Sequence, residues 1–271
     1  MHLSRPARIA LRLAAGLGFA VIYAPLLLVV VNSLNPDRSA SWPPPGLTLH
    51  WWATAWDNSG ARSALWVSLK AGLGATAIAL VLGTLAAFAV ARHRFFGRET
   101  VSFVLVLPIA LPGIVTGIAL NSAFGTVLRP LGVGLGLFTV VVGHATFCVV
   151  IVYNNVVARL RRTPGSYEEA AMDLGAHSLR AFADVTFPLV RPALLAGGLL
   201  AFALSFDEIV VTTFTAGPGV QTLPLWIFEN MTRPRQAPVV SVVAVVLVAL
   251  SVIPVYAAQR LSSDTAATSR V

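Results

Sequence analysis

The sequence predicts an all-α integral membrane protein with six transmembrane helices, because of its composition and its hydropathy pattern. Of the 271 residues, 56% are hydrophobic and 11% are charged, whereas an ordinary soluble domain is about 45–50% apolar and about 25% charged. A soluble globule could not bury so much apolar surface, so a soluble enzyme is excluded. An intrinsically disordered chain is excluded too, because such chains are polar.

Six apolar stretches have the length that crosses a bilayer, about 20 residues each. The third stretch contains Pro108, Pro112 and Gly113, so we expect it to be kinked or partly unwound. The first is longer than the roughly 7–15 residues of a signal-peptide core, so we expect it to be retained as a helix. The six predicted spans are Ile9–Val31, Ala64–Ala91, Val101–Phe124, Leu137–Ala158, Ala193–Phe214 and Val239–Ala258.

The distribution of basic residues predicts that both termini lie in the cytoplasm. Lys and Arg collect on the cytoplasmic side of membrane proteins, and this orientation places thirteen of the nineteen basic residues there. The net charge of +8 therefore records topology and is no reason to expect a nucleic-acid partner. The thirteen are Arg5, Arg8, Arg12, Arg92, Arg94, Arg98, Arg159, Arg161, Arg162, Arg180, Arg191, Arg260 and Arg270.

Tryptophans mark the opposite membrane surface. Five of the six lie in or beside the segment that joins the first two spans, where amphipathic rings settle at headgroup level. We expect this segment to be anchored at the outer interface. The five are Trp42, Trp51, Trp52, Trp56 and Trp66.

The cytoplasmic loop at residues 159–191 carries the residue pattern of ordered helices. Ser166 and Glu169 have the spacing of a capping box, which predicts a helix start. Glu168 and Glu169 then fall in the first turn, where the helix dipole favours negative charge. Gly175 can end this helix in a left-handed conformation.

A second short helix is predicted directly after the first. Ser178 is placed to cap it, and Pro188 and Pro192 precede the fifth span. Its apolar residues would share one face at helical spacing. Two roles are open for this loop: it could be a docking element for another protein or an interfacial helix lying on lipid. The face consists of Leu179, Phe182, Ala183 and Thr186.

The loop resembles the EAA loop of binding-protein-dependent ABC importer permeases. The run EAAMDLGAHSLRAFADVTFP matches the family spacing, with Val185 and Phe187 where the family usually has Ile and Leu. The resemblance implies that the loop forms coupling helices, which fit a groove on a cytoplasmic ATPase, and that the second helix is the docking lever. It also implies that residues 1–271 form a single type I ABC importer permease domain. The implied coupling residues are Glu168, Glu169, Ala170, Ala171, Gly175, Leu179, Phe182 and Pro188.

Four further segments resemble the second permease subunit of spermidine/putrescine-type importers. This resemblance implies a bacterial inner-membrane location and three kinds of partner chain: a second homologous permease, a dimer of cytoplasmic ABC ATPases and an extracytoplasmic solute-binding protein. It implies a small cationic substrate, although relatives in this subgroup carry other small organic solutes. The segments are Tyr23–Asn35, Val106–Val115, Gly143–Val150 and Ser205–Phe228.

Two adjacent acids, Asp207 and Glu208, are predicted in the body of the fifth span. Each costs about 2.5–3.5 kcal/mol at the centre of a membrane helix, so neither is expected to face lipid. They are candidates to line the path of a cation, as is the aromatic face of Tyr153. The alternatives are an ion pair or a protonated carboxyl for the acids, and packing for Tyr153.

No catalytic, nucleotide or metal pattern is present in the sequence. It contains no phosphate-binding loop of the Gly-x-x-x-x-Gly-Lys-Ser/Thr type. It has a single cysteine, Cys148, and no cluster of His, Cys and acidic residues at the spacing of zinc ligands. We therefore expect a transport subunit without enzymatic activity or cofactor. Two rival hypotheses are a proton-coupled transporter, in which Asp207, Glu208 and His144 would form a relay, and a membrane scaffold. For His144 itself we expect a hydrogen-bonded core histidine.

Overall fold

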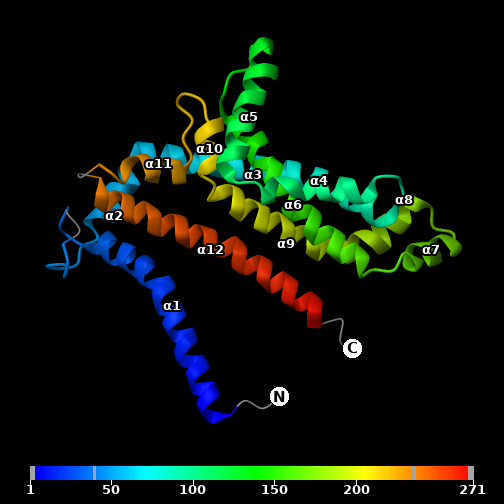
Figure 1. Cartoon of the computed structure of the whole chain (residues 1–271), viewed down its shortest axis with the longest axis horizontal. Coiled ribbons are helices and arrows are strands. Elements are labelled where there is room, and N and C mark those ends of the chain that lie inside the picture. The colour runs from blue at the N-terminus through cyan, green and yellow to red at the C-terminus, as the bar shows by residue number, and fades with distance from the viewer. Residues whose placement is uncertain (1–3, 39–40, 234–235, 268–271) are drawn as a thin grey trace. The chain divides into compact units, whose positions relative to one another are not determined.

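The computed structural model describes residues 4–38, 41–233 and 236–267, with side chains up to residue 260. All regular structure in this part of the chain is helical (Figure 1). Six helices in it are long and apolar enough to cross a membrane. Arg270, one of the thirteen basic residues used to predict the orientation, lies outside the described residues.

The chain divides into two compact units. The first contains residues 1–62 and 226–248, and the second contains residues 63–225 and 249–271. Three helices belong partly to each unit, namely α3 (Ser59–Arg92), α11 (Leu223–Asn230) and α12 (Ala237–Ala267). Both candidate functional regions lie in the second unit.

The first unit begins with α1 (Arg5–Leu34), which contains the predicted first span and exposes apolar side chains along its length. A helix that faces lipid or another membrane chain has this property. The short helix α2 (His50–Asp57) follows, and the indole of the buried Trp51 donates a 2.8 Å hydrogen bond to the carbonyl of Asn35. Trp42 and Trp56 are exposed, as expected of anchors at a membrane surface.

The second unit holds most of the helices. After α3 come two helices in place of the single predicted third span, and then the long helix α6. The loop after α6 contains short helical segments that lead into α9. In chain order these are α4 (Arg98–Ala110), α5 (Gly113–Val127), η1 (Arg129–Leu131), α6 (Leu137–Arg161), α7 (Ser166–Asp173), α8 (Ser178–Ala181), η2 (Phe182–Thr186), α9 (Phe187–Phe206) and α10 (Val210–Thr215).

The predicted interruption of the third span is confirmed. The helix stops at Ala110 and restarts at Gly113, and α5 runs at a steep angle to α4 (Figure 1). Leu111 adopts an extended conformation, which the ring of the following Pro112 favours. The segment Gly113–Leu131 qualifies alone as a candidate span.

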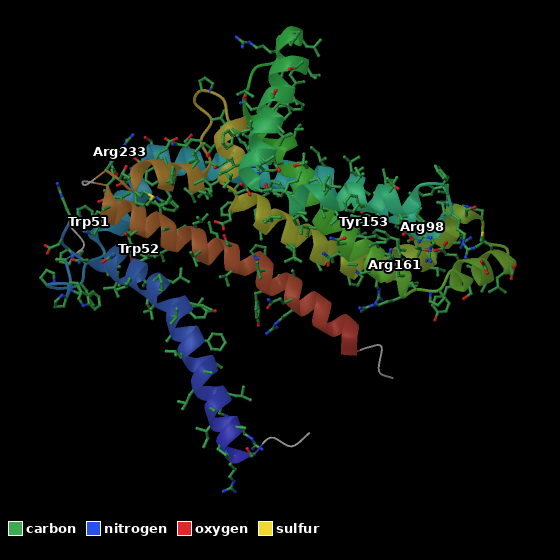
Figure 2. The ribbon with its side chains drawn as sticks, viewed as in Figure 1. Trp51, Trp52, Arg98, Tyr153, Arg161 and Arg233 are labelled. Carbon is green, nitrogen blue, oxygen red and sulfur yellow. The ribbon has the colours of Figure 1, made fainter. Side chains whose placement is uncertain are left out.

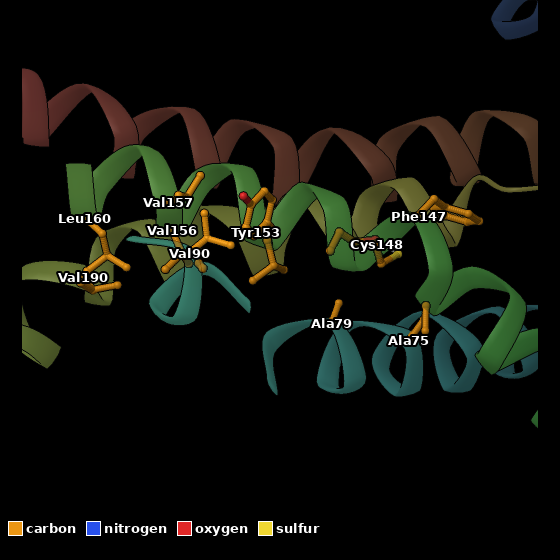
Figure 3. Close-up of a cluster of buried hydrophobic side chains, with 14 of the residues drawn as sticks. Ala75, Ala79, Val90, Phe147, Cys148, Tyr153, Val156, Val157, Leu160 and Val190 are labelled. Atoms are coloured by element: carbon orange, nitrogen blue, oxygen red, sulfur yellow. Dashed lines mark hydrogen bonds between the residues drawn. The ribbon is translucent and has the colours of Figure 1, made fainter. Parts of the chain in front are cut away.

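The core of the second unit is a contact between α3, α6 and α9. Ala75, Ala79 and Ala87 are fully buried on one side of α3, and large side chains of α6 pack in the same cluster (Figure 3). At Gly83 the backbones come so close that an added Cβ would lie 2.8 Å from the carbonyl oxygen of Val149. Small residues allow this close approach, which is the usual way that helices associate within a membrane.

Basic residues assigned to one side of the membrane lie together in the structure. Arg98 at the start of α4 and Arg161 at the end of α6 occupy the same end of the second unit (Figure 2). Tyr153 lies about two turns before Arg161 on α6. The ends of α4 and α6 that were predicted to share a side therefore do so.

Candidate functional site: the loop between α6 and α9

The helix α7 carries the Glu-Ala-Ala sequence, but it does not begin with a capping box. Gly165 has a helical backbone and takes the cap position, so Ser166 is the first residue inside the helix. No side-chain hydrogen bond caps α7. The prediction of a Ser166–Glu169 capping box is therefore wrong, because the helical backbone starts one residue earlier than the pattern assumes.

The end of α7 at Gly175 is as predicted. Gly175 has φ of +91°, a left-handed conformation that costs other residues energy. The N–H of Gly175 donates to the carbonyl of Met172 at 2.9 Å, and that of Ala176 donates to the carbonyl of Ala171 at 3.0 Å. These two bonds form a Schellman motif, which satisfies carbonyls that the helix end would otherwise leave free.

The predicted second short helix is part of a longer one. His177, and not Ser178, caps α8, since its ring nitrogen accepts from the N–H of Arg180. The π-helical turn η2 follows, and the N–H of Phe187 donates to the carbonyl of Phe182, five residues earlier. Pro188 has no N–H to donate to the ladder, and the wider turn lets the helix pass this position and continue to Phe206.

The wider turn changes which residues share a face. Of the four residues predicted to form one apolar face, Leu179 is 76% exposed whereas Thr186 is 1% exposed. Phe182 lies between these extremes, and its ring contacts Phe88 of α3 with the ring centroids 5.6 Å apart. The prediction of a single face is wrong, because the extra residue in η2 shifts the helical register.

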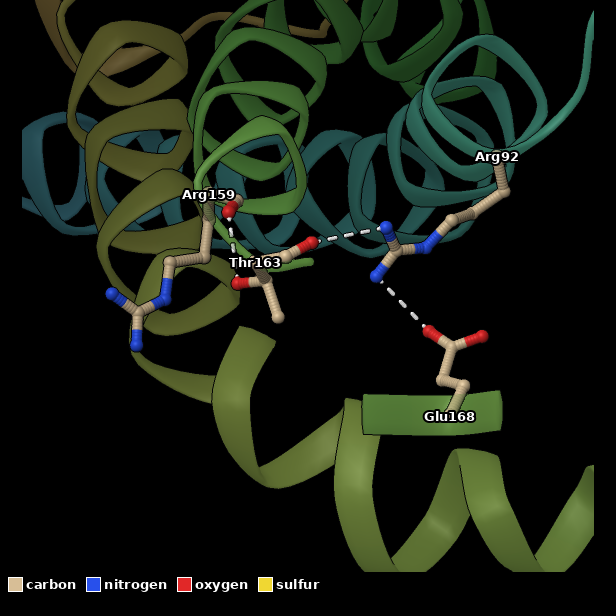
Figure 4. A network of polar contacts seen from close by, with 4 residues as sticks. All are labelled: Arg92, Arg159, Thr163 and Glu168. Atoms are coloured by element: carbon tan, nitrogen blue, oxygen red, sulfur yellow. Dashed lines mark hydrogen bonds and ion pairs between the residues drawn. The ribbon is translucent and has the colours of Figure 1, made fainter. Parts of the chain in front are cut away.

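Polar contacts attach the loop to α3 (Figure 4), and a further hydrogen bond joins α6 to α9 where the loop leaves them. The guanidinium of Arg92, at the end of α3, lies 3.0 Å from the carboxylate of Glu168 and donates to the carbonyl of Thr163 at 3.1 Å. The side chain of Arg159 on α6 donates through Nε to the carbonyl of Leu189 on α9 at 2.8 Å. A displacement of α7 would therefore act directly on α3.

The opposite side of the loop exposes apolar and acidic side chains. Glu169, Ala170 and Pro188 are exposed, and Ala171 is half-buried. Leu174 is 90% exposed, and Tyr167 and Met172 are exposed as well. These last three residues are not among the predicted coupling residues, although apolar side chains within a polar loop are a signal that the sequence carries.

Candidate functional site: the acidic break between α9 and α10

Asp207 and Glu208 do not lie within a continuous helix. The helix α9 ends at Phe206 and α10 begins at Val210, so the predicted span Ala193–Phe214 is interrupted at the acidic pair. Asp207 is exposed, whereas Glu208 is half-buried and accepts a 2.9 Å hydrogen bond from the N–H of Val211. Glu208 thus satisfies a free N–H at the start of α10, whereas the exposed carboxylate of Asp207 is available to a ligand.

His144 holds the two sides of this break together. It is fully buried on α6, with Nδ1 2.7 Å from the hydroxyl of Ser205 and Nε2 2.8 Å from that of Thr212. The hydroxyl of Thr212 gives its proton to the carbonyl of Glu208. Nε2–H therefore donates to Thr212, and Nδ1 shares a hydrogen bond with the hydroxyl of Ser205. The expectation of a hydrogen-bonded core histidine is confirmed.

Two further hydrogen bonds fix the far end of α10. The side-chain amide of Asn121 on α5 donates to the carbonyl of Phe214 at 2.6 Å. The hydroxyl of Thr139 on α6 donates to the carbonyl of Thr215 at 2.7 Å. A six-residue helix is too short to be stable alone, so these contacts account for its position.

Tyr153 is not beside the acidic pair. It is 3% exposed and packs in the core cluster, and its hydroxyl lies 2.9 Å from that of Ser102 on α4. It follows His144 by nine residues on α6, which is about 13.5 Å along the helix axis. These are the contacts expected if Tyr153 packs in the core.

In the described part of the chain no group of three or more His, Cys, Asp or Glu side chains is placed to hold a metal ion. The acidic break offers carboxylate charge and hydrogen-bond acceptors within an apolar helical unit. This arrangement can receive a cation.

Residues 79–265 match the family of binding-protein-dependent transport system inner membrane components. The chain belongs to this family, and it is a permease subunit of an ABC importer and a multi-pass inner membrane protein. Its helical architecture is the type I permease fold.

Two curated relatives come from Escherichia coli. The putrescine transport system permease protein PotI is 36% identical over 79% of this chain and 77% of its own length. The spermidine/putrescine transport system permease protein PotC is 34% identical over 91% of each chain. A third relative, the putative 2-aminoethylphosphonate transport system permease protein PhnV of Salmonella typhimurium, is 29% identical over 93% of this chain and 95% of its own.

Two solved structures share the fold. A chain of a bacterial ABC transporter involved in the import of alginate superposes with a TM-score of 0.71, at 16% identity, over 97% of this chain and 99% of that chain. A chain of the methionine transporter MetNI superposes with a TM-score of 0.59, at 18% identity, over 76% of this chain and 94% of that chain.

Proposed function

We propose that this permease carries a small organic cation of the polyamine type, such as putrescine or spermidine. The proposal is supported by the names of relatives that are 34–36% identical over most of the chain. It is also supported by the exposed carboxylate at the break between α9 and α10, which is the observation that carries it. Carboxylates bind ammonium groups through charge-assisted hydrogen bonds.

The surroundings of the acidic pair favour a mobile cation over a fixed partner in the same chain. Among the described residues, neither Asp207 nor Glu208 forms an ion pair with a basic side chain. The sequence has no Lys or Arg between residues 192 and 232. Two acids in an apolar unit without basic partners are suited to a substrate that brings the positive charge with it. Tyr153 supports the same unit through its contact with Ser102.

The chain acts as one permease domain with residues 159–191 as its coupling loop. A second homologous permease completes the pathway, a dimer of ATPase chains binds the loop, and a solute-binding protein delivers the substrate on the other side. Both termini and the loop then face the cytoplasm. The exposed surface of α7 and the Arg92–Glu168 contact fit a loop that transmits ATPase closure to α3.

A second candidate substrate is another small amine. The relative named for 2-aminoethylphosphonate covers nearly the whole chain at lower identity, and that compound also carries an ammonium group. Proton-coupled transport is not proposed, because the family to which the chain belongs works with a binding protein.

The test is substrate-stimulated ATPase activity of the full complex in proteoliposomes. Putrescine, spermidine and 2-aminoethylphosphonate would be supplied in turn with the solute-binding protein, together with a neutral sugar as a control. Stimulation and uptake with a polyamine alone support the proposal. Stimulation by 2-aminoethylphosphonate alone selects the second candidate, and uptake that survives a dead ATPase contradicts both.

A further inference from the structure

A cleft of about 330 Å³ with both apolar and basic side chains on its walls lies between α6 and α9, on the side of the coupling loop. One wall consists of Asn154, Asn155, Ala158 and Arg159 of α6 together with Arg162, the residue after this helix. The α9 wall is formed by the small or compact residues Pro192, Ala193 and Ala196. The cleft exists because the side chains of α9 at this position are short. The longer side chains of α6 line its other side. The cleft is separate from the acidic break between α9 and α10.

The guanidinium groups at this cleft are not neutralised within the described chain. Arg159 uses Nε to bind the carbonyl of Leu189, and its two terminal nitrogens point away from the Arg92–Glu168 network (Figure 4). The ion pairs formed by described residues are Arg92–Glu168 and Arg180–Asp184, so neither Arg159 nor Arg162 is paired with a carboxylate. A positively charged cleft without an acid is suited to an anion.

The position along α6 indicates which anion would reach the cleft. With 25 residues, α6 is about 37 Å long, several ångströms more than the roughly 30 Å hydrocarbon core. Arg159 is in its last turn and Arg162 is the residue after it, so both lie near headgroup level. Asn154 lies about 7.5 Å deeper than Arg159 along the helix axis. Basic residues at this end are expected from topology alone, but the cleft selects Arg159 and Arg162 and leaves out Arg161 between them.

We propose that this cleft binds the phosphate group of an anionic membrane phospholipid. Arginine forks bind phosphate oxygens with two parallel hydrogen bonds, and basic pockets between transmembrane helices are known to hold lipid headgroups. The terminal nitrogens of Arg159 and the guanidinium of Arg162 supply the charge and the donors. A bound phosphate would join α6 to α9 next to the Arg159–Leu189 bond, where the coupling loop leaves both helices.

The experiment measures the midpoint of thermal unfolding of the purified full complex in detergent while lipid is titrated. Phosphatidylglycerol is the probe, and phosphatidylcholine and inorganic phosphate are the comparison arms. Arg162→Gln removes one fork, Ala193→Leu fills the cleft without a change in charge, and Arg161→Gln is the matched control outside the cleft. Arg162 is exposed, so its substitution is not expected to unfold the protein.

The expected result is protection by phosphatidylglycerol and not by phosphatidylcholine. Arg162→Gln should raise the half-saturating lipid concentration at least about tenfold, the effect of one lost charge-assisted hydrogen bond. Ala193→Leu should raise it as well, because the larger side chain occupies the cleft, while Arg161→Gln leaves it unchanged. Equal protection by inorganic phosphate would support the phosphate site but assign it to a soluble ligand. An equal loss in Arg161→Gln, or no loss in the other two variants, would overturn the proposal.

Discussion

The carboxylate of Glu168 lies 3.0 Å from the guanidinium of Arg92 at the end of α3, whereas its neighbour Glu169 is exposed. Two adjacent acids of the same short helix therefore have different surroundings. Glu168 attaches α7 to the membrane helices of its own chain. Glu169 forms no ion pair with a described residue and is available to another protein.

The first prediction concerns this exposed acid. Glu169→Lys reverses a charge on the proposed docking surface without breaking a contact within the chain. We expect the ATPase to be lost from the purified complex, while membrane insertion is normal and stability changes by no more than about 0.5 kcal/mol. The measurement is co-purification of the ATPase with the tagged permease pair. Normal recovery of the ATPase would contradict the docking role.

Glu168→Gln is the comparison variant for this experiment. It removes the ion pair with Arg92, which is partly buried, so a loss of stability of about 1 kcal/mol is expected. ATPase binding should fall less than in Glu169→Lys, since the docking surface keeps its charge pattern. The reverse ranking of the two variants would show that the internal contact, and not the exposed acid, carries the docking.

The second prediction concerns the end of α7. Gly175→Val places a β-branched residue at φ of +91°, which costs roughly 1–2 kcal/mol or more. The helix end should rearrange, and both ATPase co-purification and transport should fall. Gly165→Ala is the control, because Gly165 has a helical backbone that alanine adopts without strain. Transport at the wild-type rate in Gly175→Val would show that the bend is not needed.

These two glycines show what local sequence can and cannot predict. The left-handed end at Gly175 follows from its place after a short helical pattern, and the structure confirms it. The capping box failed at the other end because Gly165 is itself helical. The π-helical turn at Phe182–Thr186 was missed as well, since an i to i−5 bond leaves no periodic trace in five residues.

The acidic break shows a second kind of limit. Hydropathy is continuous from Ala193 to Phe214 apart from the two acids, so a single span was predicted. The helix breaks where it does because His144, Asn121 and Thr139 bind α10 from other helices. These partners are 68 to 93 residues away in the sequence, and no local pattern records them.

The third prediction concerns His144. His144→Phe keeps an aromatic ring of similar width but leaves the buried hydroxyls of Ser205 and Thr212 without their shared partner. Thr212 keeps its hydrogen bond to the carbonyl of Glu208, but the hydroxyl of Ser205 loses its ring partner. A buried polar group without a hydrogen bond costs roughly 1–3 kcal/mol, so we expect a clear fall in the unfolding midpoint. Transport should fall further than complex yield, because the break would no longer be held. His93→Phe, at an exposed histidine after α3, serves as the control. If both variants behave alike, His144 does not hold the break.

The central claim is that Asp207 receives a cationic substrate. The most direct test is uptake of labelled putrescine by proteoliposomes that contain the full complex with Asp207→Asn. Asp57→Asn, at an exposed acid at the end of α2, is the charge-matched control. We expect normal assembly and a KM at least about tenfold higher for Asp207→Asn, equivalent to one charge-assisted hydrogen bond, with no change for Asp57→Asn. An unchanged KM for putrescine in Asp207→Asn would contradict the claim.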